Sequence, residues 1–177
     1  AGVDVLRAGG SAVDAAIATS AALAVIYPHM TSIGGDAFWL IHEGKTGKIR
    51  FLDGGGRAAA RADIGWFRDK GMTEIPFRGI APATLTVPGA VASWAEVHAK
   101  YGKLPLSRAL ESAIGYARDG FPVTQRLADF IEMVKSGLAP HNDTIRIFMP
   151  SGETPKAGTK LVNRDLARSL EAIGSDG

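Results

Sequence analysis

The segment from Ser11 to Tyr27 limits the possible folds more than any other part of this sequence. It opens with Ser11 and Asp14 at the spacing of a capping box, and it ends just before Pro28. These signals predict a helix that runs to about Ile26. Alanine dominates the segment, so small side chains occur around nearly its whole circumference and neighbouring elements can approach closely. We therefore expect this helix to be buried on more than one side.

Composition excludes several kinds of protein. The 177 residues contain 20 Lys and Arg against 18 Asp and Glu, and the scattered basic residues disfavour a nucleic acid or a membrane surface as partner. The absence of cysteine rules out disulfides, a thiolate nucleophile and cysteine-based zinc sites. The apolar stretch from Ala15 to Tyr27 is interrupted by Thr19 and Ser20 and is shorter than the roughly 20 residues of a membrane span. We expect a soluble domain.

The remaining secondary structure is predicted from periodicity and from turn residues. Two β-rich runs, 38–42 and 48–53, flank a short Gly-containing connection and predict a hairpin, and residues 84–87 predict one further short strand. Residues 136–160 are expected to form a loop. Helices are expected before Gly9, over 64–69, from Pro88-Gly89 to Tyr101, from Pro105 to Arg118 with Gly120 as its end, after Thr124, and from Asn163 onward.

This pattern predicts the α/β (α+β) class, with a helix-rich chain, one hairpin and too few strands for a finished sheet. An exposed hairpin edge and a half-covered helix are liabilities in a complete domain. The chain also begins at Ala1 without an initiator Met and without a signal-peptide pattern. We therefore interpret residues 1–177 as a single partial domain, a fragment of a longer protein.

The Gly54-Gly55-Gly56 run and the following Arg57 form the first candidate site. The run lacks the G-x-G-x-x-G spacing and the following Lys-Ser or Lys-Thr of nucleotide-binding loops. The run is either a flexible segment at the end of the strand, or it leaves space past which Arg57 can reach a substrate carboxylate with its bidentate guanidinium. Residue type alone leaves both interpretations open.

Asp36 follows two glycines and either closes a turn or positions a substrate amine. Asp53, at a strand end, is interpreted as structural. His29 lies beside the Ser32–Asp36 turn and is interpreted as a capping or packing residue. The four histidines are dispersed without the three- or four-residue spacing of a helical metal site, and no metal site is predicted. No G-x-S-x-G nucleophile elbow occurs.

Read in order, the chain resembles the γ-glutamyltranspeptidases (γ-glutamyltransferases), members of the N-terminal-nucleophile hydrolases. The resemblance extends over the whole chain, and it depends on the order and spacing of its parts rather than on any one of them. The matching segments are AGVDVLRAGGSAVDAAIA at 1–18, SIGGDAF at 32–38, TVPGAV at 86–91, YGKLPL at 101–106, ARDGFPV at 117–123 and the closing segment from Leu161 to Ile173.

The resemblance implies a fold and a mechanism. Members of this family are made as a precursor that cuts itself into a large and a small subunit, and the new N-terminal Thr of the small subunit is the nucleophile. The implied fold is a four-layer αββα sandwich completed by both subunits. This chain then corresponds to the N-terminal part of the large subunit, contains no catalytic residue and is inactive alone. Its expected partners are the small subunit and a small-molecule amide, and the Thr mechanism needs no cofactor.

The sequence departs from the family pattern at the proposed binding site. In the family an Arg shortly after the strand equivalent to Phe51–Asp53 holds the α-carboxylate of the glutamyl group. Counted from Asp53, that Arg falls at Gly55, and the nearest Arg is Arg57. Either a bulge returns Arg57 to the pocket, or the site has been rebuilt for another acyl group. Asp36 adds a carboxylate where the family usually has a longer glycine run.

Three functional hypotheses follow. The first is a γ-glutamyl amide hydrolase or acyl transferase acting on compounds such as glutathione, with Arg57, Gly55 and Asp36 as candidate substrate-binding residues. The second is a related amidohydrolase for an oxamate-type or cephalosporin-type amide. The third is a relative without catalysis that serves as a binding or structural module. Localisation, whether periplasmic, secreted or cytoplasmic, depends on a leader that would precede Ala1.

Overall fold

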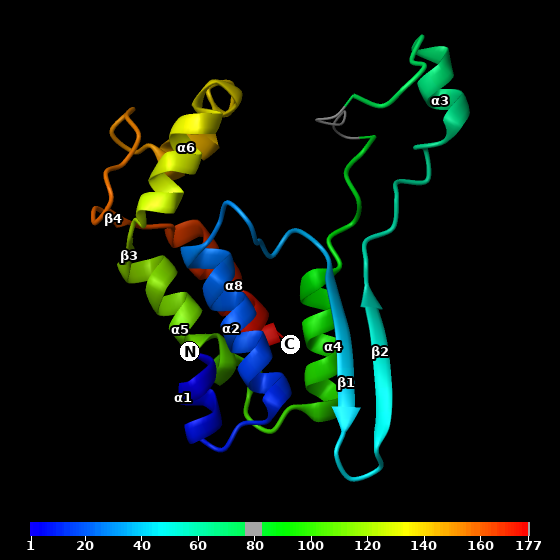
Figure 1. The fold of residues 1–177 in the computed structure, drawn as a ribbon, viewed down its shortest axis with the longest axis vertical. Coiled ribbons are helices and arrows are strands. Elements are labelled where there is room, and N and C mark those ends of the chain that lie inside the picture. The colour runs from blue at the N-terminus through cyan, green and yellow to red at the C-terminus, as the bar shows by residue number, and fades with distance from the viewer. Residues whose placement is uncertain (77–82, 177) are drawn as a thin grey trace. The chain divides into compact units, whose positions relative to one another are not determined.

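The structure is a computed structural model that describes residues 1–76 and 83–176 (Figure 1). The chain forms two compact units. Unit 1 combines residues 1–32 with residues 94–177, and unit 2 comprises residues 33–93. Each unit has its own packing and is described by itself. The prediction that residues 1–177 form one partial domain stays a prediction.

Unit 1 is helical and is built around α2 (Ala12–Ile26) and α5 (Leu106–Asp119). Helix α2 packs against α1 and α5, and α5 packs against α8. The two-residue strands Phe121–Pro122 (β3) and Lys160–Leu161 (β4) pair antiparallel. The other helices are α1 (Gly2–Arg7), α6 (Gln125–Leu138), α7 (Asn142–Phe148), α8 (Arg164–Asp176) and the part of α4 (Ala90–Tyr101) from Trp94 onward, since residues 90–93 of α4 belong to unit 2.

The helix boundaries follow the local signals in the sequence. The Ser11 hydroxyl accepts a hydrogen bond from the Asp14 amide, as predicted for a capping box. Thr124 caps α6 in the same way by accepting from Leu127. Gly9 and Gly120 follow α1 and α5 with φ of 90° and 91°, a conformation in which glycine has no steric penalty.

The alanine-rich helix α2 is buried around most of its circumference, as predicted. Ile17, Ala18 and Ala21 have no exposed surface, and neither do Leu110 and Ala113 of the neighbouring α5. Because alanine side chains are small, the two helix backbones come close together and leave little room for larger residues. The prediction that this helix is buried on more than one side is therefore confirmed, and α1 and α5 are the neighbours that it packs against.

Asp14 is a buried charge that joins α2 to a distant loop. Its Oδ2 atom accepts hydrogen bonds from the amides of Ser11 (2.7 Å), Lys103 (2.9 Å) and Leu104 (3.3 Å). Its Oδ1 atom lies 3.7 Å from Nε2 of His98, and that nitrogen donates to the Leu104 carbonyl. Burial opposes the ionisation of Asp14, but the amide hydrogen bonds outweigh it and lower its pKa.

Unit 2 contains the predicted hairpin. Strands β1 (Ala37–Glu43) and β2 (Lys48–Gly54) pair antiparallel, from Ala37 opposite Gly54 to Glu43 opposite Lys48 (Figure 1). Exposure alternates along β1, as expected for a strand with two different faces. The short helix α3 (Ile64–Asp69) also forms where it was predicted.

Two predictions about secondary structure were wrong. Residues 84–87 form no strand, and Thr86 makes only an isolated bridge to Ala58. Since a strand needs a partner over several residues, the β-favouring composition there is not sufficient. Residues 136–160 are not a continuous loop, because α6 extends to Leu138 and α7 follows at Asn142–Phe148.

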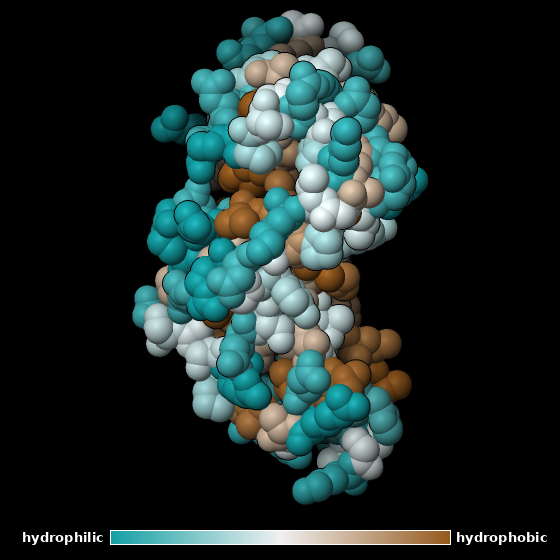
Figure 2. Space-filling view, turned by 90° about the vertical axis from the view of Figure 1, so that its left-hand side faces the viewer, coloured by the Kyte–Doolittle hydropathy of each residue, from teal (hydrophilic) through white to brown (hydrophobic). Residues whose placement is uncertain are grey.

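Large apolar side chains remain exposed in both units. The face of the hairpin formed by Phe38, Leu40, Ile49 and Phe51 is between 64% and 75% exposed. Figure 2 shows brown apolar patches on the molecular surface, between hydrophilic side chains. No helix within the described residues is long and apolar enough to cross a membrane.

Candidate substrate-binding site

Three backbone segments of unit 2 meet at the end of β2. The Gly35 carbonyl accepts hydrogen bonds from the amides of Gly89 (3.1 Å) and Ala90 (2.9 Å), where α4 begins. The Gly54–Gly56 run, here called the glycine loop, follows β2 and passes beside both segments. The candidate site is therefore supported mainly by main-chain atoms.

Sterics explain most of these glycines. A Cβ at Gly54 would collide with the Ala37 carbonyl oxygen, and one at Gly56 would collide with the Val87 carbonyl oxygen. A Cβ at Gly89 would collide with the Gly54 carbonyl oxygen. Because these obstacles are backbone atoms, they cannot move aside as a side chain could. These three positions require glycine for packing.

Gly55 differs from its neighbours. The three atoms nearest to a Cβ there would be Oδ1 of Asp53, at 2.8 Å, and two carbons of the Phe38 ring, at 3.5 Å and 3.6 Å. All three are parts of side chains. A Cβ at Gly55 would therefore require the Asp53 side chain to move, whereas a Cβ at Gly54 or Gly56 would strike the backbone.

Two carboxylates hold the glycine loop. Oδ1 of Asp36 accepts a hydrogen bond from the Gly56 amide at 2.7 Å, and Oδ1 of Asp53 accepts one from the Gly55 amide at 2.8 Å. Charged acceptors make such bonds stronger than neutral ones. The structural interpretation of Asp53 is supported, and Asp36 also has a structural contact. Among the residues that the structure describes, the other oxygen of each carboxylate accepts no hydrogen bond.

The Arg57 side chain is exposed, and the Arg57 main chain is hydrogen-bonded to the segment before α4. Its carbonyl accepts a hydrogen bond from the Val87 amide at 2.9 Å. Among the described residues, its guanidinium has no ion-pair partner. The structure thus brings Asp36, Gly55 and Arg57 into one region of unit 2 and leaves the Arg57 side chain unpaired.

Sequence reasoning missed the residues that support this site. The indole nitrogen of Trp39 donates to the Ser93 hydroxyl at 2.9 Å, and that hydroxyl donates to the Ala90 carbonyl at 2.7 Å. Ser93 is only 3% exposed. The alternation in β1 places Trp39 on the face opposite to Phe38, and this was the one signal that could have identified a support residue.

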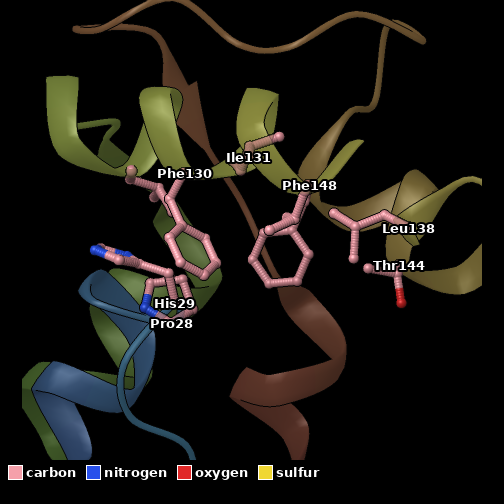
Figure 3. Close-up of a pocket in the computed structure, with 9 residues that line it drawn as sticks. Pro28, His29, Phe130, Ile131, Leu138, Thr144 and Phe148 are labelled. Atoms are coloured by element: carbon pink, nitrogen blue, oxygen red, sulfur yellow. The ribbon is translucent and has the colours of Figure 1, made fainter. Parts of the chain in front are cut away.

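A separate cavity of about 110 Å³ lies in unit 1 between α6, α7 and the chain after α2. Figure 3 shows the rings of Phe130 and Phe148 beside it, with His29 and Pro28 next to Phe130. The His29 ring lies 4.2 Å from the Tyr27 ring and 5.2 Å from the Phe130 ring, which supports a packing role. Burial and the charge of Arg126 lower the pKa of His29. Within the described residues, no cluster suited to a metal ion is found.

Comparison with known proteins gives consistent results over the whole chain. A family model described as gamma-glutamyltranspeptidase matches residues 1–177. The glutathione hydrolase-like YwrD proenzyme of Bacillus subtilis is 42% identical over 177 residues, which are all of this chain and 33% of that protein. The oxamate amidohydrolase proenzyme of Klebsiella pneumoniae is 38% identical over 178 residues, or 98% of this chain and 33% of that protein.

Solved structures agree with the sequence matches. The cephalosporin acylase of Bacillus halodurans superimposes with a TM-score of 0.90 and 37% identity, over 99% of this chain and 33% of that one. The chain spans about a third of the length of the curated relatives that it matches. The helix-rich fold with its hairpin and the match along all 177 residues establish that the chain belongs to the gamma-glutamyltranspeptidase family.

Proposed function

We propose that the protein to which this chain belongs is an amide hydrolase or acyl transferase that acts on γ-glutamyl compounds such as glutathione. The observation that carries the proposal is the family match over residues 1–177, together with the 42% identity to a glutathione hydrolase-like proenzyme. In this proposal the chain is a partial domain of a large subunit, and it is inactive without its partner.

The partner in this proposal is a small subunit cut from the same precursor. Its new N-terminal Thr supplies the nucleophile, and the α-amine of that Thr acts as the base. The names of the relatives, which include the word proenzyme, support such processing. The exposed apolar face of the hairpin also supports a further protein layer in the complete molecule.

The contribution of this chain is binding and orientation of the acyl group. The Arg57 guanidinium, which has no ion-pair partner within residues 1–76 and 83–176, is suited to a carboxylate. Asp36 uses one oxygen on the Gly56 amide and presents the other to a substrate ammonium group. Gly55 has no side chain to fill the space beside Asp53 and Phe38. Arg57, Asp36 and Gly55 form the proposed acyl subsite.

A related amidohydrolase activity is the second candidate. Gly55 stands where the resemblance places an Arg, and two similar proteins are named as an oxamate amidohydrolase and a cephalosporin acylase. These names describe those proteins. They justify including oxamate and a cephalosporin among the test substrates.

Expression of the complete gene tests the proposal. Denaturing mass spectrometry is expected to show two chains, with a Thr at the new N-terminus of the smaller one, and the processed protein is expected to hydrolyse γ-glutamyl-p-nitroanilide. Processing with turnover of oxamate or a cephalosporin alone would support the second candidate. A single uncut chain without amidase activity would contradict both and favour a relative without catalysis.

A further inference from the structure

A hydrogen bond between two side chains joins the hairpin to α4 beside the glycine loop. The indole nitrogen of Trp39 in β1 donates to the Ser93 hydroxyl in α4 at 2.9 Å, although the two residues are 54 positions apart in the chain. The same hydroxyl donates its own hydrogen to the Ala90 carbonyl at 2.7 Å. Because Ser93 is only 3% exposed, water hardly competes for these bonds. The Trp39–Ser93 bond is therefore a fixed link between β1 and the first turn of α4.

The Ser93 side chain lies against the first residue of the glycine loop. A Cβ at Gly54 would be 2.6 Å from the Ser93 Cβ atom and 3.0 Å from its Oγ atom. Gly54 is also the last residue of β2, where it is opposite Ala37 in the hairpin register. The glycine loop therefore begins at the place where the link between β1 and α4 is made.

The other end of the link leads back to Asp36. Ala90, whose carbonyl accepts the Ser93 hydrogen bond, donates its amide to the Gly35 carbonyl at 2.9 Å. Asp36 follows Gly35 and accepts the Gly56 amide at 2.7 Å. A closed circuit of contacts thus runs from β1 through α4 to the residue just before β1, and the glycine loop is held within it.

Backbone contacts around the loop are too close to absorb a change in spacing. A Cβ at Gly54 would collide with the Ala37 carbonyl oxygen, and one at Gly89 would collide with the Gly54 carbonyl oxygen. Backbone atoms packed in this way cannot rotate aside as a side chain can. A change in the distance between the hairpin and α4 is therefore expected to displace the loop and Asp36 together.

We infer that the Trp39–Ser93 hydrogen bond positions the acyl subsite, and that Trp39 and Ser93 are positioning residues that act through Gly54 and Ala90. The inference deepens the proposed function and rests on it. In that proposal Asp36 holds the Gly56 amide with one oxygen and a substrate ammonium group with the other. Both contacts require the carboxylate to stay in one place, because hydrogen bonds weaken steeply when their geometry is lost.

The first test measures the loop itself in the complete, processed protein. Hydrogen-exchange mass spectrometry of peptides that cover residues 54–58 reports whether Asp36 still holds the Gly56 amide. Ser93→Ala removes the acceptor of the link and Trp39→Phe removes its donor. Each change is expected to accelerate this exchange by roughly threefold to tenfold, as for one weakened hydrogen bond.

The second test measures the effect on the substrate, in steady-state kinetics with γ-glutamyl-p-nitroanilide. Ser93→Ala and Trp39→Phe are each expected to raise KM by roughly threefold to tenfold and to leave kcat within about twofold, because a displaced binding group holds the substrate and the transition state less well to the same extent. The double variant is expected to be no worse than the more affected single variant, since both changes remove the same bond. Oxamate or a cephalosporin replaces the anilide if the protein hydrolyses only one of those.

Leu110→Ala is the matched control for lost stability. Leu110 is fully buried in the core of unit 1 and takes no part in the link, so its replacement destabilises the protein without changing the site. At a temperature at which every variant is folded, it is expected to leave both the exchange of residues 54–58 and KM unchanged.

Unchanged exchange of residues 54–58 in Ser93→Ala and Trp39→Phe, or KM values equal to that of Leu110→Ala, would overturn the inference. Losses that multiply in the double variant would also overturn it, since the two residues would then act independently. A protein that hydrolyses none of the three amides would contradict the proposed function, and the exchange comparison would still decide whether the link positions the loop.

Discussion

Replacement of Asp14 tests the buried charge that joins α2 to the loop after α4. Asp14 has no exposed surface, and its Oδ2 atom accepts three amide hydrogen bonds, two of them from Lys103 and Leu104. Asp14→Ala removes this acceptor from all three donors. At about 1 to 2 kcal/mol for each of the three bonds to a charged group, the free energy of unfolding is expected to fall by about 3 to 6 kcal/mol.

Asp14→Asn keeps one carbonyl oxygen as an acceptor and loses the charge, so a smaller loss of about 1 to 2 kcal/mol is expected. Asp4 provides the matched control. It also lies in the first turn of a helix, but its side chain is 66% exposed. Asp4→Ala and Asp4→Asn are expected to change the free energy of unfolding by no more than about 0.5 kcal/mol.

The effect of Asp14 depends on pH with a defined sign. Its folded pKa is lowered, so the unfolded chain binds the proton more readily than the folded chain. The stabilisation is therefore complete above the unfolded pKa of about 3.9 and is lost as the pH falls through the lower folded pKa. Asp14→Asn lacks this dependence.

Urea unfolding between pH 7 and pH 3, with amide hydrogen exchange at Lys103 and Leu104, measures both effects. Exchange at these two amides is expected to accelerate in Asp14→Ala and to stay unchanged in Asp4→Ala. Equal costs for Asp14→Ala and Asp4→Ala, or an Asp14→Asn deficit that is the same at pH 7 and pH 3, would refute the reasoning.

Three further changes have defined outcomes. Ser93→Ala leaves the Trp39 indole without its acceptor and is expected to cost about 1 to 3 kcal/mol, with faster exchange of the indole proton in NMR spectra. His29→Phe is expected to reduce the loss of stability below about pH 6.5, because the lowered pKa of His29 makes the folded state resist protonation; an unchanged pH profile would contradict this. Leu110→Ala is expected to cost about 2 to 5 kcal/mol in urea unfolding, whereas Leu85→Ala, at a position that is 63% exposed, is expected to stay within about 0.5 kcal/mol.

Local signals predicted most elements of the fold because they act within a few residues. The capping box at Ser11, the cap at Thr124 and the left-handed glycine at Gly120 each determine a helix end through contacts with near neighbours. The hairpin depends on alternation and a short connection, which are also local. These features could be read without knowledge of the tertiary structure.

Long-range contacts could not be predicted in this way. Asp14 has the sequence position of a helix cap, but two of its three donors lie 89 and 90 residues away in the chain. The strand expected at 84–87 is absent because only Thr86 finds a bridge partner there. The composition of a segment determines its intrinsic β-propensity, whereas strand formation also depends on whether another segment lies beside it and pairs with it.

The glycine loop shows how sterics can separate packing from binding. Sequence alone treats Gly54, Gly55 and Gly56 as equivalent. The structure separates them, since a Cβ at Gly54 or Gly56 would strike a backbone oxygen, whereas the atom nearest to a Cβ at Gly55 is the side-chain Oδ1 of Asp53, at 2.8 Å. Because a side-chain oxygen can move aside and a backbone oxygen cannot, Gly55 is the position of the loop at which a substitution disturbs the fold least. Changes at position 55 therefore test the proposed acyl subsite more directly than changes at positions 54 and 56, which test folding.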